Sequence, residues 1–84
     1  MDKIADIKIV GANKIFSDLL DKEFSNVTLE SAAGAFVFKI KEHQEIFMNV
    51  GPRVTLSKDG ILLEGYCVVG DSLGNLCILI SKLS

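Results

Sequence analysis

The stretch from Arg53 to Leu83 contains three apolar, strand-like runs separated by turn-forming residues. The first interruption is Asp59-Gly60, and the second is the segment 70–74. Asp-Gly between two alternating runs is typical of a two-residue hairpin turn, because such a turn needs positive φ angles. The pattern therefore predicts an antiparallel meander of three strands, with Lys58 opposite Ile61 at the first turn.

The second turn is predicted to be a five-residue loop from Gly70 to Gly74, because its glycines permit the backbone angles such a loop needs. A loop centred on Ser72 places Cys67 opposite Cys77 across the hairpin. Since side chains alternate between faces, one predicted face carries Val54, Leu56, Ile61, Leu63, Cys67, Val69, Cys77 and Leu79. The other face begins with the polar residues Thr55, Ser57 and Glu64 and turns apolar at Tyr66, Val68, Leu76, Ile78 and Ile80. In a sheet with one solvated face, that face should carry polar side chains along its whole length. We therefore expect those last five side chains to be covered by the chain's own helix or to form an assembly surface.

The pattern of apolar residues in the N-terminal half predicts further strands and one helix. Ile4 to Val10 alternates and indicates a short strand. From Lys14 to Phe24 the apolar residues follow the i, i+3, i+4 spacing of an amphipathic helix, and Asn13 is a favourable N-cap. The segments 27–31 and 35–40 are predicted strands joined by a tight turn, and the helix would cover the sheet.

The segment 41–50 is compatible with two structures. A period of two places Ile46, Met48 and Val50 on one face of a strand. A period of 3.6 gives a short helix instead. The β-branched residues and the following Gly51-Pro52 favour the strand.

Length and composition indicate one domain, residues 1–84, with enough apolar residues (49%) to form a core. The fold class that these patterns predict is mostly β (α+β). It is a small, strongly bent antiparallel β-barrel of Sm-like or SH3-like size, with one amphipathic helix at about 14–24. The high apolar fraction for so short a chain also indicates an apolar surface used in assembly.

Charge and hydropathy exclude some partners. The net charge is −2 with both signs interspersed, so we expect no binding to duplex DNA. No apolar run approaches the ~18 residues of a membrane span, and the N-terminus shows no secretory signal. Two cysteines without an extracellular signature indicate a reducing compartment, and we expect the protein to be cytoplasmic.

The candidate chemistry is sparse. His43 is the only histidine, and His43-Gln44-Glu45 lacks the Pro-Cys-x-x-Cys pair that completes a deaminase zinc site. Cys67 and Cys77 are interpreted as two small buried residues or, in the sharper alternative, as a redox pair forming a reducible cross-strand disulfide. Closed structural zinc sites need four ligands. We expect no metal, no cofactor and no enzymatic activity.

Four spaced residues carry a resemblance to a known family. Gly60, Gly65, Asp71 and Asn75 follow the pattern Gly-x4-Gly-x5-Asp-x3-Asn, with an apolar run after them. This pattern resembles the first conserved motif of the Sm and Sm-like (LSm) family, over residues 53–80. The resemblance implies a bent five-stranded barrel whose subunits join edge to edge into rings and bind single-stranded RNA at the Asp-Asn loop.

Carried over by position, the resemblance implies that Asp71 and Asn75 hydrogen-bond to RNA, while Leu73 takes the place of a stacking side chain. The sequence departs from the family here, because Leu73 has no ring to stack on a base and Gly74 replaces the usual methionine. The family's second motif, with its Arg-Gly pair, is absent. Strands 27–31 and 35–40 would then complete the barrel from the N-terminal side.

The function expected from the sequence is that of a non-enzymatic binding and assembly module. It would self-associate through strand edges and apolar surface as a homo-oligomer, or bind another protein. The alternative is an Sm-like ring subunit that binds single-stranded RNA at the 71–75 loop.

Overall fold

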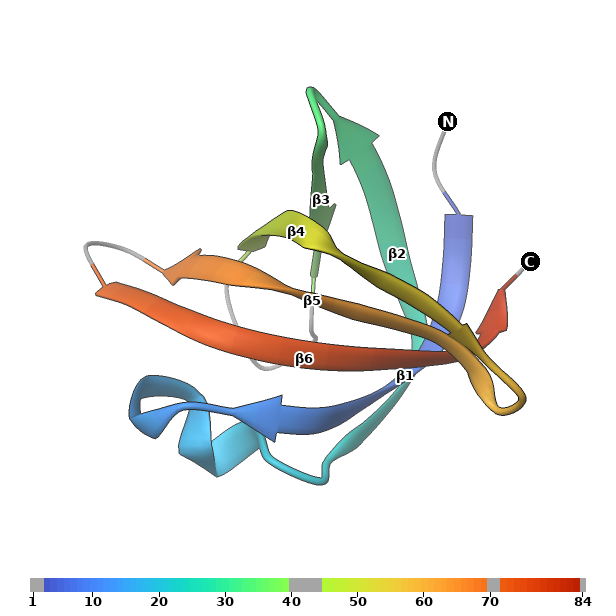
Figure 1. Cartoon of the computed structure of the whole chain (residues 1–84), viewed down its shortest axis with the longest axis horizontal. Coiled ribbons are helices and arrows are strands. Elements are labelled where there is room, and N and C mark those ends of the chain that lie inside the picture. Colours follow the sequence, from blue (N-terminus) through green and yellow to red (C-terminus); the bar gives the residue numbers. More distant parts are fainter. Residues whose placement is uncertain (1–2, 40–44, 70–71, 84) are drawn as a thin grey trace.

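The computed structural model describes residues 3–39, 45–69 and 72–83, and they form a closed antiparallel β-barrel (Figure 1). The elements in chain order are β1 (Lys3–Ala12), the 3₁₀ helix η1 (Lys14–Leu19), β2 (Glu23–Ala32), β3 (Ala35–Phe38), β4 (Ile46–Ser57), β5 (Gly60–Val69) and β6 (Ser72–Leu83). Each strand pairs with the next one, and β6 pairs with β1 to close the barrel. The predicted small antiparallel barrel is thus confirmed.

The barrel interior is filled by apolar side chains from every strand and from η1. These are Ala5, Ile7, Ile9, Phe16, Leu19, Val27, Leu29, Phe38, Ile46, Met48, Leu63, Cys67, Leu76, Ile78 and Ile80. Among the described residues none of the buried side chains is polar or charged. Burial of this apolar surface is therefore the main stabilising contribution.

The strands predicted in the N-terminal half are confirmed. Ile7 and Ile9 point inward from β1, and Val27 and Leu29 do so from β2. The turn between β2 and β3 is tight, since Ala33 and Gly34 both have positive φ angles. Ile40, the last residue of the predicted strand 35–40, and the segment 41–44 lie outside the described residues.

The predicted helix over 14–24 differs from the structure, which has a six-residue 3₁₀ helix at Lys14–Leu19. Phe16 and Leu19 are buried, and their spacing of three matches the three residues per turn of a 3₁₀ helix. Leu20 is extended, Asp21 has a positive φ, and Phe24 pairs with Ile7 as part of β2. Pairing with β1 therefore overrides the helical pattern beyond Leu19.

The ambiguous segment forms the start of β4, so the strand interpretation is confirmed for 46–50. Ile46 and Met48 are buried, and Val50 packs against the core. The strand continues through Gly51 and Pro52 to Ser57. Between the pairs Val50–Gly65 and Val54–Leu63, β4 contains two more residues than β5, which makes a bulge.

The register at the first turn differs from the prediction by two residues. The loop is Lys58–Asp59, Ser57 pairs with Gly60, and Leu56 pairs with Ile61. Only Gly60 of the predicted turn pair has a positive φ. The Ser57 hydroxyl helps to close the turn, because it accepts from the Asp59 N–H (3.3 Å) and donates to the Gly60 carbonyl (3.0 Å).

The predicted five-residue loop at the second turn is wrong. Ser72, Leu73 and Gly74 belong to β6, and Val69 pairs with Ser72. The resulting shift of the pairing by three residues moves the β6 side chains to opposite faces, because sheet faces alternate with a period of two. Cys67 therefore lies opposite Gly74, and Cys77 lies opposite Glu64.

Candidate functional site: the β4 edge and the outer groove

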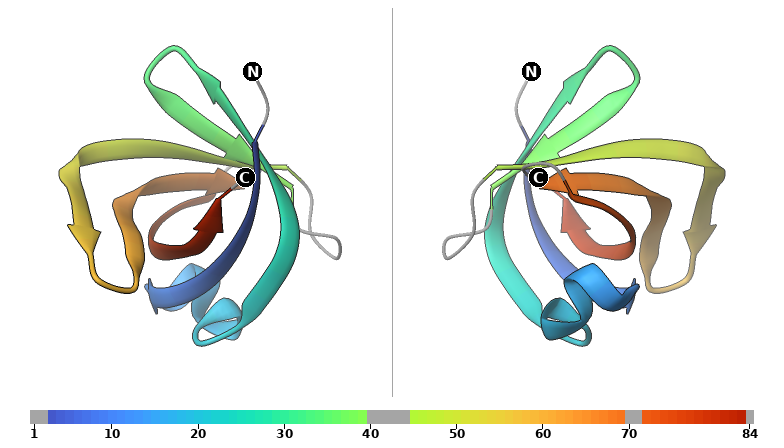
Figure 2. Two further views of the ribbon diagram at one scale, coloured as in Figure 1. Left: turned by 90° about the vertical axis from the view of Figure 1, so that its right-hand side faces the viewer. Right: turned by 90° about the vertical axis from the view of Figure 1, so that its left-hand side faces the viewer.

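The second half of β4 has an uncovered edge. β3 pairs with β4 only along 46–49, whereas β5 pairs with β4 as far as Ser57. No described strand pairs with the other side of 53–57. Figure 2 shows that the β2–β3 hairpin and the β4–β5 hairpin diverge. We call the segment Arg53–Ser57 the β4 edge.

Two local features produce this edge. β3 has only four residues and begins directly after the turn at Ala33–Gly34, so no residue of β3 remains to pair with β4 beyond Asn49. Gly51-Pro52 then lies in the bulge, where proline cannot donate a ladder hydrogen bond and glycine adapts to the bend. The bulge bends β4 away from the shorter strand.

The β4 edge carries exposed apolar side chains. Val54 is 53% exposed and Leu56 is 80% exposed, although their partners on β5 are the buried Leu63 and the half-buried Ile61. Val54 and Leu56 thus extend the apolar face of the barrel beyond the point where other strands cover it. Natural edge strands are commonly protected by charges or prolines, and here Arg53 and Pro52 precede the apolar pair while Lys58 follows it.

The backbone of the edge is oriented for further pairing. A two-residue turn is closed by a hydrogen bond between its flanking residues, here Ser57 and Gly60. Because hydrogen-bonded and non-hydrogen-bonded pairs alternate along an antiparallel ladder, Thr55 bonds to β5. Val54 and Leu56 consequently direct their N–H and C=O groups toward the free edge.

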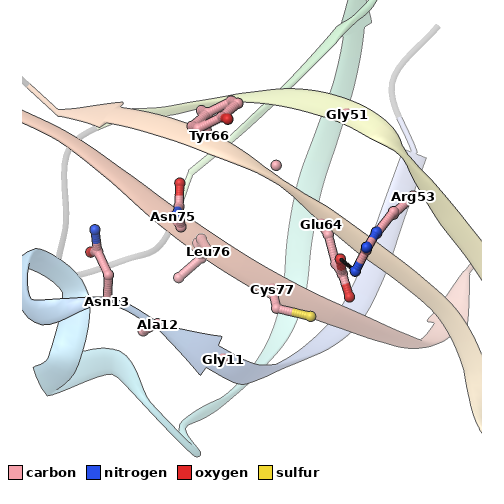
Figure 3. A pocket seen from close by; sticks show the side chains of 11 residues that line it. Gly11, Ala12, Asn13, Gly51, Arg53, Glu64, Tyr66, Asn75, Leu76 and Cys77 are labelled. Carbon is pink, nitrogen blue, oxygen red and sulfur yellow. Dashed lines mark ion pairs between the residues drawn. The ribbon is translucent and has the colours of Figure 1, made fainter.

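A second feature is a groove of about 490 Å³ on the outer face of the barrel (Figure 3). It is lined by Gly11, Ala12, Asn13, Gly51, Arg53, Glu64, Gly65, Tyr66, Asn75, Leu76 and Cys77, which come from β1, β4, β5, β6 and the residue preceding η1. Three of these residues are glycines, so the absence of side chains hollows the surface. We call this hollow the outer groove.

Polar groups line the outer groove around one aromatic ring. Tyr66, which is 54% exposed, lies directly opposite the exposed Asn75. Arg53 and Glu64, which also line the outer groove, form a loose ion pair with 3.8 Å between Nη1 and Oε2. The charges of that pair cancel, so the groove favours a ligand without a large net charge.

The thiol of Cys77 is half-buried at the end of the groove near Glu64 (Figure 3). Its pKa is raised, first by burial and second by the negative charge of Glu64. A raised pKa lowers the thiolate fraction, and the thiolate is the reactive form. Burial raises the pKa of the Cys67 thiol to about 12. Neither environment resembles that of an activated cysteine.

The structure separates the residues predicted as an assembly surface. Leu76, Ile78 and Ile80 lie in the barrel core, because the β5–β6 loop is shorter than expected and the alternation is reversed. Tyr66 and Val68 do face outward. Val68 lies between Phe47 and Leu73 in the ladder. We call the apolar area formed by Phe47, Tyr66, Val68 and Leu73 the outer patch.

The remaining predicted site residues are also divided. Asp71 lies outside the described residues. Leu73 is 59% exposed in the outer patch, and Asn75 lies in the outer groove. Cys67 and Cys77 are both free and are not opposite each other, so the predicted cross-strand pair is wrong.

Sequence reasoning missed the β4 edge. It placed Val54 and Leu56 on a covered face, because alternation shows which side of a strand a residue takes but not whether that side is covered. Pro52 indicates a strand start or an edge, because it cannot donate to a ladder, but the local sequence does not show that the edge extends over 53–57. His43 lies outside the described residues.

Across 3–39, 45–69 and 72–83, no three histidine, cysteine or acidic side chains cluster in a way that could hold a metal ion. The same part of the chain contains no helix with the length and hydropathy needed to span a membrane. Searches against protein-family models, curated proteins and solved structures find no match for this chain. The class that the structure defines is therefore that of a small closed antiparallel barrel with an uncovered edge strand.

Proposed function

We propose that the protein is a non-enzymatic assembly module that self-associates through the β4 edge. The observation that carries this proposal is the exposure of Val54 and Leu56 on a strand segment that no described strand pairs on its second side. The alternation of the ladder directs their N–H and C=O groups to that side. An exposed edge of this kind accepts an added strand, because main-chain hydrogen bonds give affinity and alternate side chains give specificity.

Self-association is tested by measuring mass as a function of concentration, using light scattering or sedimentation. We expect the mass to rise above the 9.1 kDa of one chain. Val54→Lys should shift the association to at least ~10-fold higher concentration, because a charge on an edge strand opposes pairing. Ile15→Lys is the matched control, since Ile15 is 47% exposed on η1, away from the edge.

A further variant separates the β4 edge from the outer patch. Phe47→Lys places the same charge in the outer patch at a residue of similar exposure (49%). If Phe47→Lys abolishes association and Val54→Lys does not, the assembly surface is the outer patch. A chain that stays monomeric at every accessible concentration would remove the assembly function.

A second candidate function is the binding of single-stranded RNA, and one observation favours it. Tyr66 and Asn75 lie side by side in the outer groove, where the ring could stack on a base and the amide could bond to its edge. Tyr66 would then supply the stacking group that Leu73 lacks. The neutral Arg53–Glu64 pair opposes this function, since phosphate backbones require uncompensated positive charge.

RNA binding is tested by titrating short oligouridine at low and high salt. The function predicts affinity that falls with salt and is lost in Tyr66→Leu, whereas Phe47→Leu should leave it unchanged because Phe47 lies outside the groove. The absence of binding at low salt would exclude this candidate.

A further inference from the structure

The β4 edge is complementary to itself. We propose that two copies pair their β4 edges antiparallel about a two-fold axis at Thr55, which joins the two barrels through one continuous sheet. This inference rests on the assembly function proposed above and adds the partner segment, the register and the number of copies.

The backbone is compatible with this register. In an antiparallel pair centred on Thr55, Val54 lies opposite Leu56 of the second copy, and Leu56 lies opposite Val54 of the second copy. Both residues direct their N–H and C=O groups outward, so these two pairs are hydrogen-bonded and the central Thr55 pair is not. The alternation that an antiparallel ladder requires is therefore satisfied.

The side chains fit the same register. Val54 and Leu56 lie on the same face of the sheet as the core residue Leu63. In the dimer, the Val54 and Leu56 side chains of both copies would therefore form one continuous apolar surface. The two Thr55 side chains meet on the outer face, where a cross-strand pair of threonines is favourable. Exposed apolar surface is thereby covered in both copies.

The charges are complementary as well. Arg53 lies opposite Ser57 of the second copy, and Asp59 of the second copy follows two residues later. Arg53 is 80% exposed at its side chain, and its contact with Glu64 is long at 3.8 Å, so the guanidinium is free to reach a second carboxylate. A register centred on Val54 would move Arg53 away from Asp59. A register centred on Leu56 would place Arg53 opposite Asp59 of the second copy but would replace the central threonine pair by Thr55 opposite Ser57.

A two-fold pairing of this kind is isologous and uses up the edge in both copies. The expected assembly is consequently a dimer with twice the mass of the chain. It is not the ring that the Sm-like resemblance implies, because ring formation needs two different edges on each subunit.

Cysteine cross-linking tests the register. The background variant is Cys77→Ser, while Cys67 is kept because it is buried and its pKa is raised to about 12. In this background, Thr55→Cys should form an intermolecular disulfide in high yield with a mild oxidant. A non-hydrogen-bonded pair brings the two Cα atoms to ~4.5 Å, within the range that a disulfide spans.

Two matched variants control for random collision. Arg53→Cys lies on the same face of the same strand, but its two copies would be roughly 13 Å apart along the strand direction, so it should not cross-link. Thr28→Cys makes the same substitution at an exposed threonine of β2 and should also remain uncross-linked. Asp59→Arg should weaken the dimer several-fold, and Asp59→Ser should weaken it less.

The outcomes distinguish the two proposals. A dimer with selective cross-linking at position 55 supports both of them. An assembly in which Thr55→Cys cross-links no better than Arg53→Cys or Thr28→Cys overturns this register and leaves self-association standing. A mass of five to eight chains overturns the two-fold pairing, and a stable monomer overturns both.

Discussion

The carbonyl oxygen of Ile80 occupies the space that a side chain on Gly60 would need. A Cβ built on Gly60 overlaps this oxygen and lies 2.9 Å from the carbonyl carbon of Ile80. Gly60 also has a φ of +147°, a value that L-residues rarely adopt. The β4–β5 turn therefore depends on glycine for close contact with β6 as well as for its backbone angle.

We predict that Gly60→Ala destabilises the barrel by about 2 kcal/mol or more, because the substitution adds backbone strain to a steric clash. Urea unfolding followed by circular dichroism measures the change. Gly51→Ala is the matched control, since a Cβ there would lie 3.7 Å from the Glu64 carbonyl oxygen, which is an ordinary contact. Equal losses for the two variants would contradict the prediction.

A second prediction concerns the contact between Gly74 and η1. A Cβ on Gly74 would lie 2.5 Å from Cε2 of Phe16, so the ring packs directly on the β6 backbone. We expect Gly74→Ala to cost about 1–3 kcal/mol, the usual cost of overpacking a filled core. In a Phe16→Leu background the same substitution should cost about 1 kcal/mol less, because the nearer obstacle, the ring, is gone, while Oδ1 of Asn13 at 2.8 Å remains.

A double-mutant cycle in urea measures this coupling between Gly74 and Phe16. If Gly74→Ala costs the same in both backgrounds, the ring is not the obstacle, and η1 does not pack against β6 as described.

The third prediction tests which face of β6 lines the core. Ile78 is buried at 2% exposure, whereas Leu73 on the same strand is 59% exposed. Ile78→Ala should therefore cost about 2–5 kcal/mol of unfolding free energy. Leu73→Ala should change it by about 0.5 kcal/mol or less, because little surface is buried there. A larger loss for Leu73→Ala than for Ile78→Ala would mean that β6 turns its other face to the core.

Much of the fold could be predicted from alternation alone, because inward residues at a period of two are a local property of each strand. Alternation places Ile7 with Ile9 on one face and Ile46 with Met48 on another, and the two residues of each pair are buried together. The face of β6 could not be predicted in the same way. It depends on the number of residues in a loop, and an odd change in that number reverses every side chain of the strand.

The predictions of the helix and of the site were wrong for a related reason. The apolar spacing up to Phe24 is helical, but Phe24 pairs with Ile7, a contact that no local pattern reveals. Whether Val54 and Leu56 are covered depends on the length of β3, which is distant in the sequence. The strands could be predicted from local residues, whereas the uncovered edge follows from how the strands meet.

The last prediction concerns the pH dependence of stability. Burial raises the pKa of the Cys67 thiol from 9.0 to about 12. In the unfolded chain the thiol loses its proton near pH 9, while in the folded chain it keeps the proton up to about pH 12. The stabilisation linked to this proton is therefore fully present below pH 9, and it is lost as the pH rises from 9 toward 12.

Urea unfolding at pH 7.5 and at pH 10.5, in the presence of a reductant, measures this effect. Wild-type protein should lose more stability between the two pH values than Cys67→Ala, although Cys67→Ala starts from a lower stability because it removes a buried sulfur. The comparison cancels the titration of lysines, which both proteins share. An equal loss in the two proteins would mean that the Cys67 thiol titrates normally and is not enclosed by the barrel.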